Sequence, residues 1–314
     1  MTSLLSSATS EVDFTYIAER SDGRRFTYNR GASTPTTSYE SASTSKMVTA
    51  AVILRLVQDG YLNLTDKPHD RITGWTIGSG DSLYNMTLAH LLSFRSGLED
   101  EPACLNFGAS DFETCAKNAG TTNAGNGVVP GQEFYYSGSH MQVAGLMAAK
   151  ARNKTWAQIF SDFKTLTGLF ASSTYDLPSS TNPRLGGGMH WTANDYMAFL
   201  KALKNGQILN STYLNQMLTD QTASATFTYS PVSAIGEAWH YGFGLWHECQ
   251  SATYNCTPGT RVSSPGAYGA YPFWDRTNNY FGIVARQGSL GTYPNGIAIE
   301  RTVRAKAEAW ASCL

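Results

Sequence analysis

Apolar residues along the chain follow two periods, and each period marks a different kind of element. Residues 13–31, DFTYIAERSDGRRFTYNRG, alternate apolar and polar positions around the turn SDG, which predicts an antiparallel hairpin. From Lys46 the spacing becomes helical and stops at Gly60, a residue suited to a C-terminal cap. Strand-like runs return near the C-terminus, before one last helical run: residues 240–249, 261–275 and 280–288, then 296–314.

The middle of the chain, residues 71–230, alternates helical stretches with long loops. The helical stretches are MTLAHLLSFRSG, SHMQVAGLMAAKARN and WTANDYMAFLKALKNG. Strands at both ends and helices between them predict an α+β fold, in which an antiparallel sheet is flanked by helices. We expect residues 1–70 and 231–314 to form the sheet subdomain and residues 71–230 to form an inserted, mostly helical subdomain. The active site is expected in the cleft between the two.

Charge and length then exclude several classes of protein. Only 15% of the 314 residues are charged, and 23 basic residues nearly cancel 24 acidic ones, so no electrostatic footprint for nucleic acid or an anionic membrane exists. No run approaches the roughly 20 apolar residues of a membrane-spanning helix. The N-terminal residues MTSLLSSATSEV lack the basic start and apolar core of a signal peptide. If the protein is exported, we expect that its signal has been removed. The oligomeric state is not predicted.

Cysteine spacing indicates the compartment. Cys104 and Cys115 bracket a polar loop, CLNFGASDFETC, and Cys249 and Cys256 bracket CQSATYNC, which resembles a hairpin tip. Two local disulfides are expected, with free thiols as the alternative, and four cysteines permit three pairings. Cys313 is left over, and no C-x-x-C motif occurs. Disulfides and loops rich in Ser, Thr, Asn and Gly favour an oxidising setting, so a secreted or periplasmic location is expected.

The candidate chemistry begins at STSK, residues 43–46. Positions three apart at a helix start share a face, so Lys46 can bring its amine to the hydroxyl of Ser43. A hydroxyl needs an adjacent base to become a good nucleophile, and a lysine in a low-dielectric cleft can lose its proton near neutral pH. The same spacing occurs at Ser161 and Lys164. The spacing alone therefore leaves open a capping serine and a solvated lysine.

The segments that follow STSK distinguish this S-x-x-K motif from the second one at residues 161–164. They occur in this order: LVQDGYLNLTDK, MTLAHLLSFRSGL, PGQEFYYSGSHMQVAG, LGGGMHWTANDYMAFLKALKNGQIL, HYGFGLW and SSPGAYGAYPFWD. In order and spacing the chain resembles the serine β-lactamase and penicillin-binding protein superfamily. The resemblance is to the class C β-lactamase-like branch, which includes family VIII carboxylesterases and D-aminopeptidases. It covers nearly the whole chain, implies a β-lactamase/transpeptidase-like fold, and favours Ser43 over Ser161.

The resemblance also implies roles for the site residues. The family pattern F-x-Y-S-N aligns with residues 134–138, which makes Tyr136 the match to a tyrosine that moves protons between nucleophile and leaving group. The alternative interpretation of Tyr136 is an aromatic residue of the core. Ser43 is then the nucleophile and Lys46 the general base, and the backbone N–H groups of Ser43 and Ala267 form the oxyanion hole. This chemistry implies no metal and no cofactor.

Two departures from the family pattern concern the substrate. The family's basic third motif aligns with residues 264–266, Ser-Pro-Gly, which carry no charge to bind a substrate carboxylate. Arg261 and Arg286 are alternative cations that no motif supports. Gly138 stands where the pattern has Asn. Four residues are expected to bind substrate: Gly138, Ser264, Gly266 and Tyr268.

Aromatic residues near the third motif form either an apolar acyl pocket or sheet core. They are Tyr268, Tyr271, Phe273 and Trp274. No G-x-S-x-G elbow and no H-E-x-x-H motif occurs, which argues against an α/β-hydrolase triad and a zinc protease. The sequence therefore predicts a serine hydrolase with a small-molecule ester, amide or peptide substrate, and favours esters. The alternatives are a β-lactamase, D-amino-acid peptidase or amidase, and a catalytically silent ligand or partner binder.

Overall fold

A seven-stranded antiparallel sheet forms the main layer of the protein. The computed structural model describes residues 1–7 and 11–313, and the strand order is β10-β11-β12-β13-β14-β1-β2. The strands are β1 (Phe14–Arg20), β2 (Arg25–Arg30), β10 (His240–Tyr241), β11 (Trp246–His247), β12 (Arg261–Ser263), β13 (Tyr271–Asp275) and β14 (Tyr280–Ala285). The first strand of the N-terminal hairpin pairs with the last strand of the C-terminal region. The predicted hairpin is therefore confirmed, together with a sheet built from both ends of the chain.

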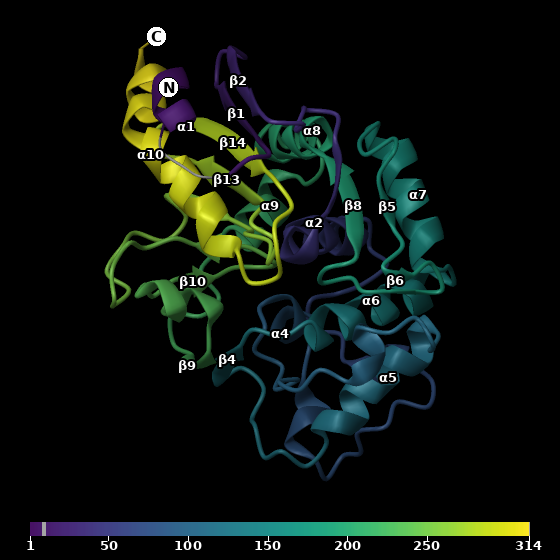
Figure 1. Cartoon of the computed structure of the whole chain (residues 1–314). Helices are drawn as coiled ribbons and strands as arrows, with labels where there is room; N and C mark the ends of the chain where they lie inside the picture. Colours follow the sequence, from purple (N-terminus) through teal and green to yellow (C-terminus); the bar gives the residue numbers. More distant parts are fainter. Residues whose placement is uncertain (8–10, 314) are drawn as a thin grey trace.

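Helices cover both faces of this sheet. Every residue of β1 and β14 is buried, and side chains along a strand point alternately to opposite faces, so both faces of the sheet are covered at these two strands. Helices α8 (Ala193–Lys204) and α10 (Tyr293–Ser312) both pack on these strands, and α1 (Thr2–Ser7) lies against α10 (Figure 1). The predicted fold class, α+β with a β-lactamase/transpeptidase-like arrangement, is confirmed.

The remaining elements lie between β2 and β10 in sequence. The helices are α2 (Ser45–Gln58), α3 (Pro68–Arg71), α4 (Leu88–Leu92), α5 (Phe112–Asn123), α6 (Ser139–Arg152), α7 (Trp156–Thr167) and α9 (Ser211–Met217). The short strands are β3 (Ser38–Glu40), β4 (Glu133–Tyr135), β5 (Thr174–Tyr175), β6 (Pro178–Ser179), β7 (Asn182–Pro183), β8 (Met189–Thr192) and β9 (Thr226–Tyr229). The division into two subdomains at residues 71 and 230 stays a prediction. No helix in the described part of the chain has the length and apolar run needed to cross a bilayer.

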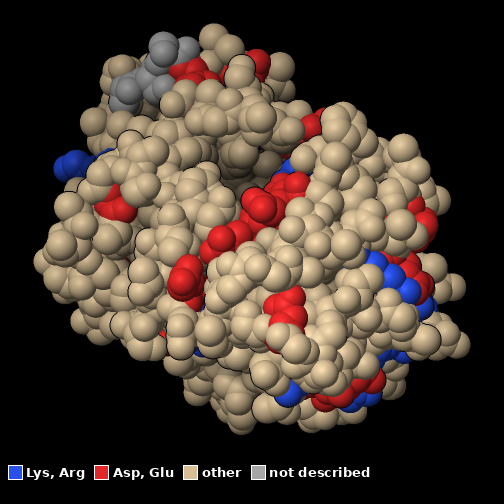
Figure 2. All heavy atoms as spheres, turned by 90° about the horizontal axis from the view of Figure 1, so that it is seen from below, with Lys and Arg blue, Asp and Glu red and all other residues tan. Residues whose placement is uncertain are grey.

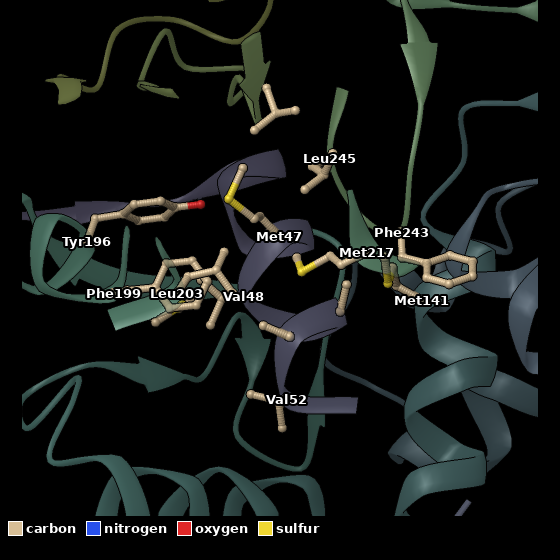
Figure 3. Packing of buried hydrophobic residues seen from close by; sticks show 14 of the residues in the cluster. Met47, Val48, Val52, Met141, Tyr196, Phe199, Leu203, Met217, Phe243 and Leu245 are labelled. Carbon is tan, nitrogen blue, oxygen red and sulfur yellow. The ribbon is translucent and has the colours of Figure 1, made fainter. Parts of the chain in front are cut away.

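Helix α2 lies in the core, as its helical apolar spacing predicts. All of its residues except Arg55 and Gln58 are buried. Figure 3 shows its Met47, Val48 and Val52 among apolar side chains of other segments: Met141, Tyr196, Phe199, Leu203, Met217, Phe243 and Leu245. Because packing surrounds the helix, its N-terminal residues are held in a constant position relative to the sheet.

The protein contains two disulfides, and several element boundaries differ from those that the sequence predicts. Cys104 pairs with Cys115, and Cys249 pairs with Cys256 in the connection between β11 and β12, while Cys313 is free. Cys115 lies on α5 rather than in a polar loop.

Two of the expected runs are also divided. The helical run at 86–97 is only the five residues of α4, because Phe94 has a positive φ of 59° that a helix does not accommodate. The strand-like runs at 240–249 and 261–275 each form two strands, since turns at their glycines reverse the chain.

Candidate active site

Ser43 lies in a single 3-10 turn, residues 42–44, directly before α2. The preceding residue, Ala42, has a φ of 43°, in the left-handed region that residues with a Cβ rarely occupy. Such backbone strain costs about 1–3 kcal/mol and is concentrated at functional sites. The tight turn leaves the Ser43 side chain at the surface of a cavity instead of inside the helix.

Lys46 lies one turn further along, buried beneath Ser43. A hydrogen bond of 2.8 Å joins its Nζ to Ser43 Oγ, and Nζ donates a second, of 2.7 Å, to the carbonyl oxygen of Gly186. Burial lowers the pKa of Lys46 to about 7; the positive charge of Arg184 lowers it further, and Glu101 acts in the opposite direction. About half of the amine is therefore neutral at pH 7 and able to accept a proton from Ser43.

Tyr136 approaches the same pair from the other side. It directly follows β4, whose parallel pairing with β9 continues as a hydrogen bond from the Tyr136 N–H to the carbonyl oxygen of Tyr229. Its ring centroid is 4.8 Å from Lys46 Nζ, and the ring stacks on Trp246 at 5.1 Å. Burial raises the pKa of the Tyr136 phenol well above its ordinary value, and a hydrogen bond with Ser43 offsets only part of this rise. The phenol keeps its proton at neutral pH and can donate it.

The segment after β12 contacts the turn that carries Ser43. Ser264 is buried, and its Oγ donates a 3.0 Å hydrogen bond to the carbonyl oxygen of Ser43. A Cβ at Gly266 would lie 2.6 Å from the carbonyl oxygen of Ser41, so the close approach of the two segments requires a glycine. Ala267 lines the same cavity as Ser43, and its N–H has no hydrogen-bond partner among the described residues. The oxyanion hole of Ser43 and Ala267 stays a prediction.

The cavity that joins these residues measures about 540 Å³. Five of the expected site residues line it: Ser43, Lys46, Tyr136, Gly138 and Ala267. Three expected substrate-binding residues are not in the described lining: Ser264, Gly266 and Tyr268. Tyr271, Phe273 and Trp274 are buried on β13. Of the two readings of these aromatic residues, the structure therefore favours sheet core for the three on β13.

The two arginines considered as substitutes for the third motif are engaged elsewhere. Arg261 is buried among Glu248, Asp275 and Glu300, with N–O distances of 3.3, 3.0 and 2.7 Å. Arg286 pairs with Glu11. Neither arginine lines the described cavity. The duplicate S-x-x-K lies within α7, where Ser161 is exposed and Lys164 donates to a backbone carbonyl oxygen.

Four charged residues at the cavity were missed by the sequence analysis: Glu99, Asp100, Glu101 and Arg184. Arg184 and Glu101 form an ion pair of 2.7 Å beside Gly138, and both line the cavity. A signal for each existed in the sequence. Glu101 closes the acidic run Glu-Asp-Glu just after SFRSGL, and Arg184 directly precedes LGGG, residues 185–188. The backbone N–H groups of Gly187 and Gly188 both donate to the Arg184 carbonyl oxygen, so GGG, residues 186–188, forms a tight turn next to Arg184.

The walls of the cavity differ in character. Three carboxylates, Glu99, Asp100 and Glu101, line one part, and apolar or aromatic residues line another: Tyr135, Tyr229, Val232, Leu290 and Tyr293. Figure 2 shows Asp and Glu side chains in a row beside a hollow on this face of the molecule. Among the described residues, neither Glu99 nor Asp100 has a cationic partner within salt-bridge distance. The lining therefore favours a ligand that is apolar in one part and positively charged or neutral in another.

Comparisons with known proteins agree with this arrangement. A family model described as Beta-lactamase matches residues 15–298. A candidate beta-lactamase from Bacteroides dorei DSM 17855 is 25% identical, with a TM-score of 0.80 and coverage of 97% of this chain and 96% of that one.

Two further solved structures share the fold at 18% identity. EstCE1, a hydrolase with promiscuous acyltransferase activity, has a TM-score of 0.75 and 96% coverage of each chain. The D-amino acid amidase from Ochrobactrum anthropi SV3 has a TM-score of 0.73 and coverage of 97% and 99%. Among curated proteins, Protein flp of Staphylococcus aureus strain MW2 is 27% identical over 135 residues, which are 41% of this chain and 26% of that protein's length.

Proposed function

Because the chain belongs to the Beta-lactamase family, we propose that it is a serine hydrolase that forms a covalent acyl-enzyme on Ser43. The observation that carries the proposal is the 2.8 Å contact between Ser43 Oγ and a buried lysine amine whose pKa is about 7, at the wall of a 540 Å³ cavity. A nucleophile with its base in a cavity is the arrangement that acyl transfer needs.

In the proposed reaction, neutral Lys46 takes the hydroxyl proton of Ser43 as Oγ bonds to the substrate's carbonyl carbon. The carbonyl electron pair moves to oxygen, where the N–H groups of Ser43 and Ala267 stabilise the negative charge. The bond to the leaving group then breaks, and the leaving group takes a proton from Tyr136, which is reprotonated by the Lys46 ammonium. Water attacks the acyl-enzyme by the same proton path, releases the carboxylic acid and restores the Ser43 hydroxyl.

The first candidate substrate is a carboxylic ester or a related small acyl compound. The cavity offers no cation at residue 264 and no amide side chain at residue 138, and these are the groups the family pattern carries for a substrate carboxylate and acylamide. Arg184, the permanently charged cation among the described residues that line the cavity, is paired with Glu101. An uncharged ester needs neither handle, and the apolar wall suits its acyl part.

A second candidate is an amide or peptide with a free amino group near the scissile bond. The carboxylates of Glu99 and Asp100 favour this candidate, because no cation among the described residues neutralises them. An ammonium group beside these carboxylates would form a charge-assisted contact. The similarity in fold to a D-amino acid amidase agrees with it. Two disulfides favour an extracytoplasmic location for either activity.

A fluorophosphonate probe tests the nucleophile. We expect the wild-type protein to be labelled at Ser43, as located by peptide mass spectrometry, and Ser43→Ala to remain unlabelled. Ser161→Ala is the matched control, because it removes the serine of the other S-x-x-K, and it should be labelled like the wild type. An unlabelled wild type, or equal labelling of Ser43→Ala, would leave the silent binder as the better description.

Two pairs of substrates separate the candidate activities. A p-nitrophenyl butyrate assay compared with a chromogenic cephalosporin tests esters against β-lactams, and turnover of the cephalosporin alone would reverse our order. Phenylalanine p-nitroanilide compared with its N-acetyl form tests the ammonium group, because acetylation replaces the charged amine by a neutral amide. Faster cleavage of the free amine in the D or L series would support the second candidate. Equal rates for the two compounds would mean that the carboxylates of Glu99 and Asp100 do not favour an ammonium group, which would contradict the second candidate.

A further inference from the structure

Gly138 lies where the family pattern has an asparagine, and its missing side chain leaves room for an ion pair. A Cβ built on Gly138 would lie 2.9 Å from Glu101 Oε1 and 3.5 Å from both Arg184 Nε and Arg184 Nη2. The contact with Glu101 is shorter than real Cβ contacts allow, so an asparagine could enter only if the carboxylate moved. The ion pair in its present position therefore depends on the absence of a side chain at residue 138.

The ion pair is held by contacts at each of its groups. Glu101 Oε2 accepts a 2.7 Å hydrogen bond from Arg184 Nη2, and Glu101 Oε1 accepts one of 2.5 Å from the Gly138 N–H. Arg184 Nη1 donates a 2.6 Å bond to Asn106. Each side chain of the pair is 29% exposed, so solvent screens their charges only in part. These bonds place a fixed positive and a fixed negative charge beside residue 138.

The Lys46 amine is close to the same point. A Cβ on Gly186 would lie 3.4 Å both from the Gly138 Cα and from Lys46 Nζ. The backbone of residue 138 and the Lys46 amine are therefore both close neighbours of Gly186. Arg184 and Gly186 are separated by one residue, and the Gly186 carbonyl oxygen accepts from Lys46. The turn that binds the amine is therefore the turn that carries the arginine.

We propose that Arg184 and Glu101 have replaced the side chain that the family carries at residue 138 and act as a pair of opposed positioning charges on the Lys46 amine. This inference rests on the proposed role of Lys46 as the base. Burial already favours the neutral form of Lys46; the arginine favours it further and the glutamate opposes it, so the balance between the two charges adjusts how much neutral base is present at a given pH. Neither residue touches the reacting atoms in this proposal.

Burial has the largest effect on the charge of the Lys46 amine, and the other titratable groups near it are neutral near pH 7. From the β4 to α6 segment, Tyr136 presents a phenol that stays protonated, and burial lowers the pKa of His140 to about 4, so both are neutral near pH 7. From α2 and its preceding turn, only the Ser43 hydroxyl contacts the amine. Among the residues that the structure describes, Arg184 and Glu101 are the charged side chains whose charges act on Lys46.

The test is the pH dependence of kcat/KM on an ester, paired with the pH dependence of the fluorophosphonate labelling rate. Because neutral Lys46 is the active form, the rate falls as pH drops through its pKa of about 7. Arg184→Met removes the charge that disfavours the ammonium, so the acid limb should move up, by about one pH unit for a neighbouring charge, and the rate at pH 7 should fall about fivefold. Glu101→Gln should move the limb down.

Three further variants separate the charge effect from a structural one. Arg184→Lys keeps the positive charge and should keep the acid limb near its wild-type position. Arg184→Met combined with Glu101→Gln removes both charges and should place the limb between those of the single variants. Glu113→Gln removes a carboxylate that pairs with Lys117 and Lys150 away from the site, and should leave the limb unchanged.

The outcomes distinguish this inference from the proposed function. An unlabelled, inactive wild type overturns the proposed function and the inference with it. A labelled, active wild type whose acid limb stays in place, or moves the same way in Arg184→Met and Glu101→Gln, overturns the inference alone. A loss of rate in both variants without any movement of the limb would mean that the pair only maintains the structure.

Discussion

Replacing Arg261 by methionine is expected to destabilise the protein strongly without changing its chemistry. The Arg261 guanidinium lies against the carboxylates of Glu248, Asp275 and Glu300, and the four side chains are at most 9% exposed. The substitution would leave Glu248 and Glu300 with Arg304 and would leave Asp275 with no cationic partner among the described residues.

The magnitude follows from the burial of these charges. Removing one partner of a buried ion pair costs about 3–5 kcal/mol, because the remaining charge is neither hydrated nor neutralised. Arg261 serves three carboxylates, so we expect a loss near the upper end, about 4–5 kcal/mol. Total stabilities of about 5–15 kcal/mol make this loss a large share of the folding free energy.

Equilibrium unfolding in urea measures the loss, and Arg24→Met is the matched control. Arg24 is 73% exposed and pairs with Asp22, so its replacement should cost less than about 1 kcal/mol. Arg261→Lys keeps a positive charge and provides a milder variant if Arg261→Met does not fold. A loss equal to that of Arg24→Met would refute the reasoning. An unchanged free energy of unfolding with a reduced kcat/KM would instead mean that Arg261 acts on the substrate.

Three more predictions concern the base, a glycine and a disulfide. With the Lys46 pKa at about 7 and the neutral amine as the active form, kcat/KM should be about tenfold lower at pH 6 than at pH 8, and a flat profile would contradict this assignment. Gly244→Ala places a Cβ 2.6 Å from the Lys46 carbonyl oxygen at a φ of 73°, so urea unfolding should reveal a loss of about 3 kcal/mol. Gly23→Ala, with nothing within 4 Å, should lose less. Replacing Cys249 and Cys256 by serine opens a loop with a separation of 7 residues and should lower the free energy of unfolding by about 2.4 kcal/mol. If the disulfide is absent, reducing the wild-type protein would leave its free energy of unfolding unchanged, which would contradict the prediction.

Local pattern carried most of the fold prediction. The alternation around SDG and the helical spacing after Lys46 depend on neighbouring residues, whose geometry is set by the period of the element itself. The same reason explains the errors. A period cannot reveal that Phe94 adopts a positive φ, or that the chain turns at Gly244, because these conformations are imposed by the packing of distant segments.

The sequence by itself determined that Ser43 and Lys46 can share one face at a helix start, because they are three residues apart. It also supplied local cysteine pairs. Only the tertiary structure decided which charges reach this site. Arg184 and Glu101 are 83 positions apart and meet beside Gly138, whereas Arg261, close to the third motif, is turned into a buried cluster. The physical reason is that a charge acts through distance in space, and separation along the chain fixes that distance only within a turn or two of one element.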